Sequence, residues 1–293
     1  MRSEKEMMDL ILGVAARDER IRAVYLNGSR ANPKVPRDIF QDYDIVYAVT
    51  DTEGFIKDKS WLKLFGEVVV MQEPDNNVLF HDESADFKVR YAYLMQFMDG
   101  NRIDLSLKNM ESSIKECREE KLTIVLLDKD GLLPEINPPS DEDYHVKKPS
   151  GIQFDHCCNE FWWVSPYIAK GLWRRELLYA LDHLNLYARP MLLLMLSWQA
   201  GIPTEFTVSV GKCGKYLDQY LPEELWGKLL KTYPAAEPEQ IWDALLTMGE
   251  LFRETAVQVA AAMGFEYDYG QDQKTMDYLR DIRTLPGDAK EIR

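Results

Sequence analysis

The segment "VYLNGSRANPKVPRDIFQDYDIVY", residues 24–47, contains a Gly-Ser pair and, further on, two aspartates that flank one tyrosine. Its first residues are apolar and rich in strand-forming types, so they predict a short strand that ends at Gly28. The run "DYDIVYAV", residues 42–49, alternates and predicts a second strand. Alternation places Asp42 and Asp44 together on the face opposite the intervening tyrosine.

The spacing of the two aspartates suits a divalent cation. Residues two apart on a strand point to the same side, with α-carbons about 7 Å apart. Carboxylates this close repel each other when buried, so Asp42 and Asp44 need either a cation or open water. Mg²⁺ is the natural partner because it takes a few carboxylate oxygens and completes its shell with water and phosphates. The alternative is a solvated loop, in which a D-x-D pattern is common.

A third carboxylate comes later in the chain. Asp104 lies in "RIDLSL", where alternation puts it on the polar side of a predicted strand. If this strand lies beside the one carrying Asp42 and Asp44, three carboxylates converge. Such a triad suits nucleotidyl transfer, in which a metal neutralises a triphosphate and a carboxylate orients or deprotonates an acceptor hydroxyl. The turn at Gly28 would let backbone N–H groups approach a phosphate.

The first half of the chain has the pattern of a sheet with few helices. Ser3 and Glu6 form a candidate capping box for an amphipathic helix over residues 4–17. The sequence "DG" at 99–100 is a hairpin turn signal. Further strands are predicted over residues 67–72, 88–98 and 101–107.

The second half of the chain is predicted to be helical. Residues 132–151 hold four prolines and a cluster of charges, and apolar spacing turns helical from residue 152. A length of 293 residues also favours two domains over one. We therefore predict an α+β chain, with a mixed-sheet domain over residues 1–135 and an all-helical domain over residues 150–293.

Composition restricts the class of protein. The formal net charge of −14 disfavours nucleic acid as a partner and favours a cationic small molecule. No stretch reads as a signal peptide or a membrane span. The four cysteines show no paired C-x-x-C spacing and read as reduced thiols, mostly in the core. We expect a cytoplasmic protein, with a monomer slightly favoured over an oligomer.

Several of these stretches, in this order, resemble one enzyme family. They are "LNGSRAN", "FQDYDIVYAV", "DGNRIDLSL", "VLLDKD", "FDHCCNEFWWVSPYIAKGLWRRELLYALDHLN" and "RPMLLLML". Together they resemble the aminoglycoside 6-adenylyltransferases of the nucleotidyltransferase superfamily, which modify streptomycin. The resemblance covers nearly the whole chain, including the helical half.

The resemblance implies an activity and a set of residues for it. The activity is magnesium-dependent transfer of AMP from ATP to a hydroxyl of streptomycin, with release of pyrophosphate, which inactivates the antibiotic. Asp42 and Asp44 would be the metal ligands, with Asp104 as the third carboxylate, acting as base, metal ligand or both. The N-terminal domain would be the nucleotidyltransferase domain, and the helical domain would bind the substrate.

The same resemblance implies contacts to the triphosphate. Gly28, Ser29 and Arg30 would form its cradle. Lys212 and Lys215 in "VGKCGKYL" sit where such enzymes carry a lysine-bearing helix start, and we interpret them as contacts to the β- or γ-phosphate. A solvated helix face is the alternative for each lysine.

The acceptor site is predicted from chemistry alone. Glu160 and Asp182 lie in a helical stretch with several tryptophans, and carboxylates and aromatic faces both bind guanidinium and ammonium groups. We therefore select these two as substrate contacts. Tryptophans at this density nevertheless favour helix packing over a sugar site.

Two other functions stay open at this stage. One is adenylylation of another acceptor, such as a lincosamide, a protein side chain or an RNA end. The other is a non-catalytic nucleotide-binding or antitoxin-like partner that kept the fold without turnover. The Gly-Ser pair and the three aspartates count against the second.

Overall fold

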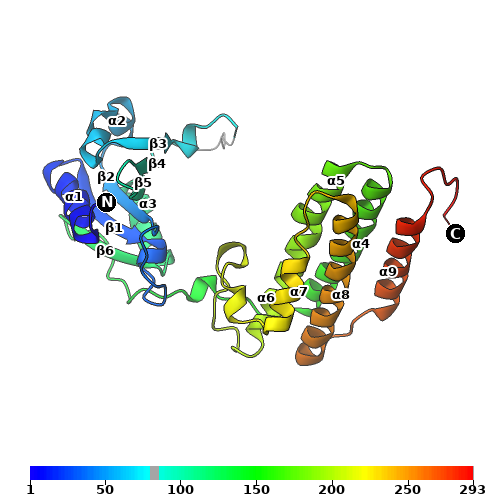
Figure 1. Ribbon diagram of the computed structural model, residues 1–293. Coiled ribbons are helices and arrows are strands. Elements are labelled where there is room, and N and C mark those ends of the chain that lie inside the picture. Colours follow the sequence, from blue (N-terminus) through cyan, green and yellow to red (C-terminus); the bar gives the residue numbers. More distant parts are fainter. Residues whose placement is uncertain (80–85, 293) are drawn as a thin grey trace. The chain divides into compact units, whose positions relative to one another are not determined.

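The chain divides into two compact units, each with its own hydrophobic core (Figure 1). The structure is a computed structural model that describes residues 1–79 and 86–292. Unit 1 is Met1–Asp143, and unit 2 begins at Tyr144. The division falls inside the proline-rich segment at residues 132–151, where helical spacing begins in the sequence.

Unit 1 is built on a six-stranded mixed sheet in the order β3-β4-β5-β2-β1-β6. β2 and β5 pair in parallel, whereas the other neighbours pair antiparallel. The predicted α+β class with a mixed sheet is therefore confirmed. The elements are α1 (Glu4–Arg17), β1 (Ile21–Asn27), β2 (Tyr43–Val49), α2 (Thr52–Lys57), β3 (Val68–Gln72), β4 (Arg90–Phe97), β5 (Arg102–Asn109), α3 (Met110–Glu119) and β6 (Thr123–Asp128).

The sheet is buried on both faces around its centre. One face packs against α1, α2 and the 3-10 segment η2 (Lys59–Phe65), with Tyr43, Ile45 and Ile103 fully or almost fully buried. On the other face Val46 packs with Cys117 of α3. Because β2 is covered on both sides, a charged side chain on it lies in partly desolvated surroundings.

Local signals in the sequence are found where they were predicted. The capping box at Ser3 and Glu6 begins α1. The turn at Asp99 and Gly100 joins β4 to β5 as an antiparallel hairpin, with Gly100 at φ +88° and its N–H donating to the Phe97 carbonyl at 3.0 Å.

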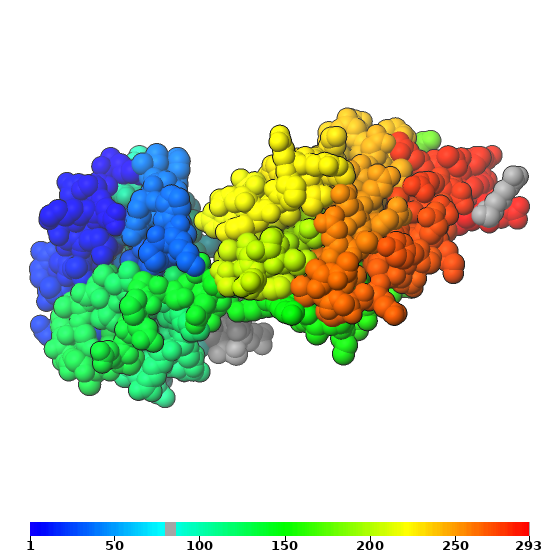
Figure 2. All heavy atoms as spheres, turned by 90° about the horizontal axis from the view of Figure 1, so that it is seen from below, coloured from blue at the N-terminus to red at the C-terminus, as the bar shows by residue number. Residues whose placement is uncertain are grey.

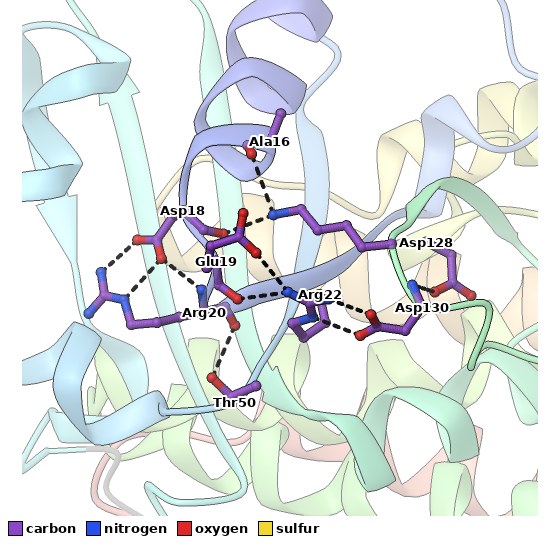
Figure 3. A network of polar contacts seen from close by, with 9 residues as sticks. Ala16, Asp18, Glu19, Arg20, Arg22, Thr50, Asp128 and Asp130 are labelled. Atoms are coloured by element: carbon purple, nitrogen blue, oxygen red, sulfur yellow. Dashed lines mark hydrogen bonds and ion pairs between the residues drawn. The ribbon is translucent and has the colours of Figure 1, made fainter.

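An ion-pair network fixes the beginning of β1 (Figure 3). Arg20 binds Asp18 through Nε and one terminal nitrogen, at 3.0 and 2.6 Å. Arg22 pairs with Asp130 just beyond β6, and Lys129 donates to the Asp18 carbonyl at 3.0 Å. This network lies at the opposite end of β1 from Gly28, so it anchors the strand without entering the acidic site.

Unit 2 is all-helical, as predicted. Its α-helices are α4 (Gly151–Trp173), α5 (Leu177–Asp182), α6 (Arg189–Gly201), α7 (Glu223–Lys231), α8 (Pro238–Met263) and α9 (Tyr269–Thr284), and a π-helical segment, η5 (His183–Ala188), joins α5 to α6.

The core of unit 2 forms around α4. Phe161 of α4 stacks on Phe252 of α8 with ring centroids 3.9 Å apart. The red helix α9 lies beside the orange helix α8 in the space-filling view (Figure 2). Across the part of the chain that the structure describes, we find no helix with the length and apolar character needed to span a membrane.

Candidate active site

The parallel pairing of β2 with β5 brings two of the predicted carboxylates together. Asp44 stands directly opposite Asp104 in the register, and Tyr43 stands opposite Ile103. Neighbouring strands lie about 4.8 Å apart, and alternation puts both carboxylates on the same face. Asp42 immediately precedes β2 and shares that face. The structure thus gathers three acidic residues at one end of two adjacent strands.

Gly28 lies against this acidic cluster because β1 is the other neighbour of β2. Asn27 pairs with Asp44, and Gly28 follows at φ +70°, in the left-handed region. A Cβ atom added to Gly28 would lie 2.4 Å from Oδ2 of Asp44. Glycine is therefore required here both by the backbone conformation and by the approach of the carboxylate.

A guanidinium group sits among the carboxylates. Arg102 Nε lies 2.8 Å from Oδ1 of Asp104, and one terminal nitrogen lies 2.9 Å from Oδ2. The same Nε lies 3.6 Å from Oδ2 of Asp42. Sequence reasoning missed Arg102, although its position two residues before Asp104 puts both side chains on one strand face.

The protonation of the cluster reflects burial and crowding of negative charge. The pKa of Asp44 is raised to about 6, first by burial and then by the charges of Asp104 and Asp42. Burial is also the main cause that raises the pKa of Asp42. The guanidinium of Arg102 opposes both shifts without cancelling them. The single guanidinium of Arg102 therefore does not fully neutralise the carboxylates of the cluster.

Arg30 occupies a different place from the one that the resemblance implied. Its side chain is buried, and it donates to the carbonyl groups of Asp42 at 3.0 Å and Gln41 at 2.8 Å. The guanidinium also lies 3.7 Å from the centre of the Tyr43 ring. Two of its nitrogens thus bind the backbone that enters β2, and the third lies 3.5 Å from the carboxylate of Glu4. The structure gives the Arg30 side chain a role in positioning Asp42, which differs from a direct phosphate contact.

The acidic cluster does not form a closed metal cage. Within residues 1–79 and 86–292, no three His, Cys, Asp or Glu side chains are arranged so that they could hold a metal ion. Both oxygens of Asp104 are bonded to Arg102. The chemistry of the donors still fits Mg²⁺, because carboxylate oxygens on neighbouring strands are its usual protein ligands.

Unit 2 contributes a pocket of about 1030 Å³. Two of the predicted residues, Glu160 of α4 and Lys212, line it. The other two do not: Lys215 Nζ lies 4.9 Å from the centre of the Tyr216 ring, and Asp182 is exposed at the end of α5. Lys212 begins a single 3-10 turn rather than an α-helix, after Gly211 at φ +73°.

Nearly the whole chain is similar in sequence to known proteins. Residues 1–282 match the family described as streptomycin adenylyltransferase. The chain is 42% identical over 279 residues to an aminoglycoside 6-adenylyltransferase of Campylobacter jejuni, with 95% of each chain covered. It is 42% identical over 273 residues to that of Bacillus subtilis (strain 168), with 92% of this chain and 95% of the relative covered. A crystal structure of an aminoglycoside 6-adenyltransferase from Bacillus subtilis matches at 37% identity and a TM-score of 0.48, covering 97% of this chain and 100% of that one.

Replacing Gly28 by alanine should destabilise unit 1 by several kcal/mol, because the change adds a collision with Asp44 to an unfavourable φ. Gly131→Ala is the matched control, since Gly131 has φ +65° but no atom within 4 Å of an added Cβ. That control should cost only about 1 kcal/mol. Urea unfolding monitored by circular dichroism measures both. Equal losses for the two variants would show that the contact with Asp44 does not matter.

Asp44→Asn should stabilise unit 1 at neutral pH in metal-free buffer. The pKa of Asp44 is raised from 3.8 in the unfolded chain to about 6 in the folded protein. Below pH 4 the folded protein therefore has its full stability with respect to this group. That stability is lost as the pH rises through 6, because the unfolded chain ionises more readily than the folded protein. The gain for the asparagine variant at pH 7 should be on the order of 2 kcal/mol and should vanish near pH 4. Unfolding curves at the two pH values test this, and a variant equally or less stable at pH 7 contradicts it.

Proposed function

This chain belongs to the streptomycin adenylyltransferase family, and from that premise we propose that it transfers AMP from ATP to a hydroxyl of streptomycin or a related aminoglycoside. Membership makes the chain a nucleotidyltransferase. One structural observation carries the proposal furthest. It is the register of β2 and β5, which sets Asp44 opposite Asp104 beside the glycine turn.

We assign the metal to the acidic cluster. Asp42 and Asp44 would hold Mg²⁺, with Asp104 as the third carboxylate. When bound, the ion supplies positive charge that neutralises the oxygens of the triphosphate and makes the attacked phosphorus more electrophilic. The raised pKa of Asp44 supports this assignment, because it reflects negative charge that the protein alone leaves unbalanced.

The residues of the chain then have separate tasks in the reaction. An acceptor hydroxyl attacks the α-phosphorus, a new P–O bond forms, and the bond to pyrophosphate breaks. Asp104 orients the hydroxyl and accepts its proton. Backbone N–H groups after Gly28 bind phosphate oxygens, since the missing side chain allows close approach. The interpretation of Lys212 and Lys215 as contacts to the β- or γ-phosphate stays a prediction.

The reaction also requires Arg102 to release Asp104. Both oxygens of Asp104 accept hydrogen bonds from Arg102, so the guanidinium competes with an acceptor hydroxyl for this carboxylate. Entry of a cation into the cluster would weaken this pairing by repelling the guanidinium. Arg102 is thus the cation that pairs with Asp42 and Asp104 in the protein itself, and a bound Mg²⁺ would supply positive charge to the same carboxylates.

Asp42→Asn and Asp44→Asn should each lower magnesium-dependent transfer of AMP to streptomycin by at least about 100-fold, since each removes a carboxylate that would hold the metal. The assay is the gain of one AMP in the mass of the drug, together with pyrophosphate release. Asp38→Asn in the same loop is the matched control and should keep its activity. Full activity in either cluster variant, with the fold intact by circular dichroism, would refute the metal assignment.

Arg102→Gln should tighten binding of Mn²⁺, used as a probe for Mg²⁺, to the nucleotide-free protein by about fivefold, because a competing cation is removed. Isothermal titration calorimetry measures the dissociation constant directly. Arg17→Gln, at the end of α1, is the control and should leave the constant unchanged. Weaker binding in Arg102→Gln would mean that the guanidinium supports the site rather than competes for it.

A further inference from the structure

The asparagine that precedes the glycine turn has both ends of its side-chain amide bound. Asn27 is the last residue of β1, and Gly28 and Ser29 follow it in the turn. The hydroxyl of Thr123 donates to Oδ1 of Asn27 at 2.9 Å. At the other end of the amide, Nδ2 of Asn27 donates to Oε1 of Glu116 at 3.4 Å. Two side chains from outside β1 therefore fix the orientation of this amide.

The two partners of the amide are themselves held in place. Thr123 is 1% exposed and begins β6, where it stands opposite Asn27 in the antiparallel register. Glu116 belongs to α3, which covers this face of the sheet. Its Oε2 accepts from the hydroxyl of Tyr25, and its Oε1 lies 2.7 Å from Nζ of Lys108. The network thus ties β1 to β5, β6 and α3.

A polar network in this place is costly. Each buried polar group needs a hydrogen-bond partner, whereas apolar side chains would fill the same space without that requirement. Burial and the charge of Glu116 raise the pKa of Tyr25, so its hydroxyl stays protonated and remains a donor to that carboxylate. A network of this cost beside the acidic site indicates a role other than packing.

An asparagine at the entry to a turn ordinarily binds the turn itself. Its side-chain oxygen accepts from the N–H two residues further along the chain. Asn32 does this a few residues later, where it accepts from the N–H of Lys34 at 2.9 Å. The backbone of Asn27 is extended, with φ −111° and ψ −177°, which permits the same bond to the N–H of Ser29.

Asn27 does not make this bond. Its side chain forms no cap on the turn, and in the part of the chain that the structure describes the N–H of Ser29 has no hydrogen-bond acceptor. The oxygen that would accept this N–H is bonded to Thr123 instead. The donor follows Gly28, where an added Cβ would collide with Asp44, so it adjoins the acidic cluster. It is therefore available to a phosphate oxygen.

We propose that Thr123 and Glu116 are positioning residues that hold Asn27 off the turn and so keep the N–H of Ser29 open for a phosphate oxygen of ATP. Neither residue touches the reacting atoms, because each acts through Asn27. When either partner is lost, the side chain of Asn27 turns back onto this N–H and competes with the phosphate. The inference rests on the proposed function and adds the residues that set the affinity for the nucleotide.

Calorimetry on the full chain tests this with Mg²⁺ and an ATP analogue that carries a methylene group between the α- and β-phosphates. Thr123→Val should raise the dissociation constant of the analogue about tenfold, which corresponds to one hydrogen bond to a charged group. In the transfer assay it should raise KM for ATP by the same factor and leave KM for streptomycin unchanged. Thr52→Val is the matched control, since Thr52 is also buried in unit 1, and should keep the native constant.

A second substitution separates positioning from stability. Asn27→Ala removes the side chain that is held, so alone it should change the dissociation constant by less than about twofold, and in Thr123→Val it should restore near-native affinity. Loss of a merely structural contact would not be restored by removing a further member of the network. Urea unfolding should show that the double variant is no more stable than Thr123→Val. Glu116→Gln, alone and with Asn27→Ala, supplies the same comparison if Thr123→Val does not fold.

The outcomes distinguish this inference from the proposed function. Folded Thr123→Val and Glu116→Gln variants that bind the analogue with native affinity would overturn the inference and leave the activity standing. A double variant that binds no better than Thr123→Val would also overturn it. Native protein that binds the analogue and does not modify streptomycin would overturn the proposed acceptor, whereas the calorimetry would still decide the inference. Native protein that does not bind the analogue would overturn both.

Discussion

Repulsion among the carboxylates of Asp42, Asp44 and Asp104 is the constraint on which the site depends. The parallel register of β2 and β5 forces two of them side by side, and burial of the sheet weakens the screening that water would supply. Arg102 offsets part of this repulsion, because its guanidinium pairs with Asp104 and lies near Asp42. The compensation of negative charge is incomplete, because the pKa of Asp44 is still raised. A site that stays short of positive charge is suited to attract a metal ion, and the metal in turn can bind a triphosphate.

The surrounding fold keeps this unfavourable arrangement in place. Gly28 lets β1 end against Asp44, where any side chain would collide. Arg30 holds the carbonyl groups of Gln41 and Asp42 and so fixes the entry into β2. Apolar side chains on the opposite face of β2 and β5 are buried together in the core of unit 1. The residues around the site thus stabilise unit 1, whereas the clustered carboxylates destabilise it. This balance is common in enzymes.

Much of this was predictable from the sequence, and the rest depended on contacts that no single segment encodes. The capping box, the hairpin at Gly100 and the faces of β2 and β5 follow from local rules. The pairing of β2 with β5 does not follow from local rules, because the sequence of a strand does not specify which other strand it pairs with. The contact of the buried Arg30 with the Tyr43 ring does not follow from local rules either, because it depends on tertiary packing. Arg102 could have been found from its two-residue spacing to Asp104, which puts both side chains on one face of β5.

A crystal structure of the full chain with Mg²⁺ and a non-hydrolysable ATP analogue tests the central claim most directly. We predict an ion bound to the carboxylates of Asp42 and Asp44, with the phosphates against the turn at Gly28 and Arg102 no longer bonded to both oxygens of Asp104. An ion and phosphates bound elsewhere, with the pair of bonds between Arg102 and Asp104 intact, would contradict the account.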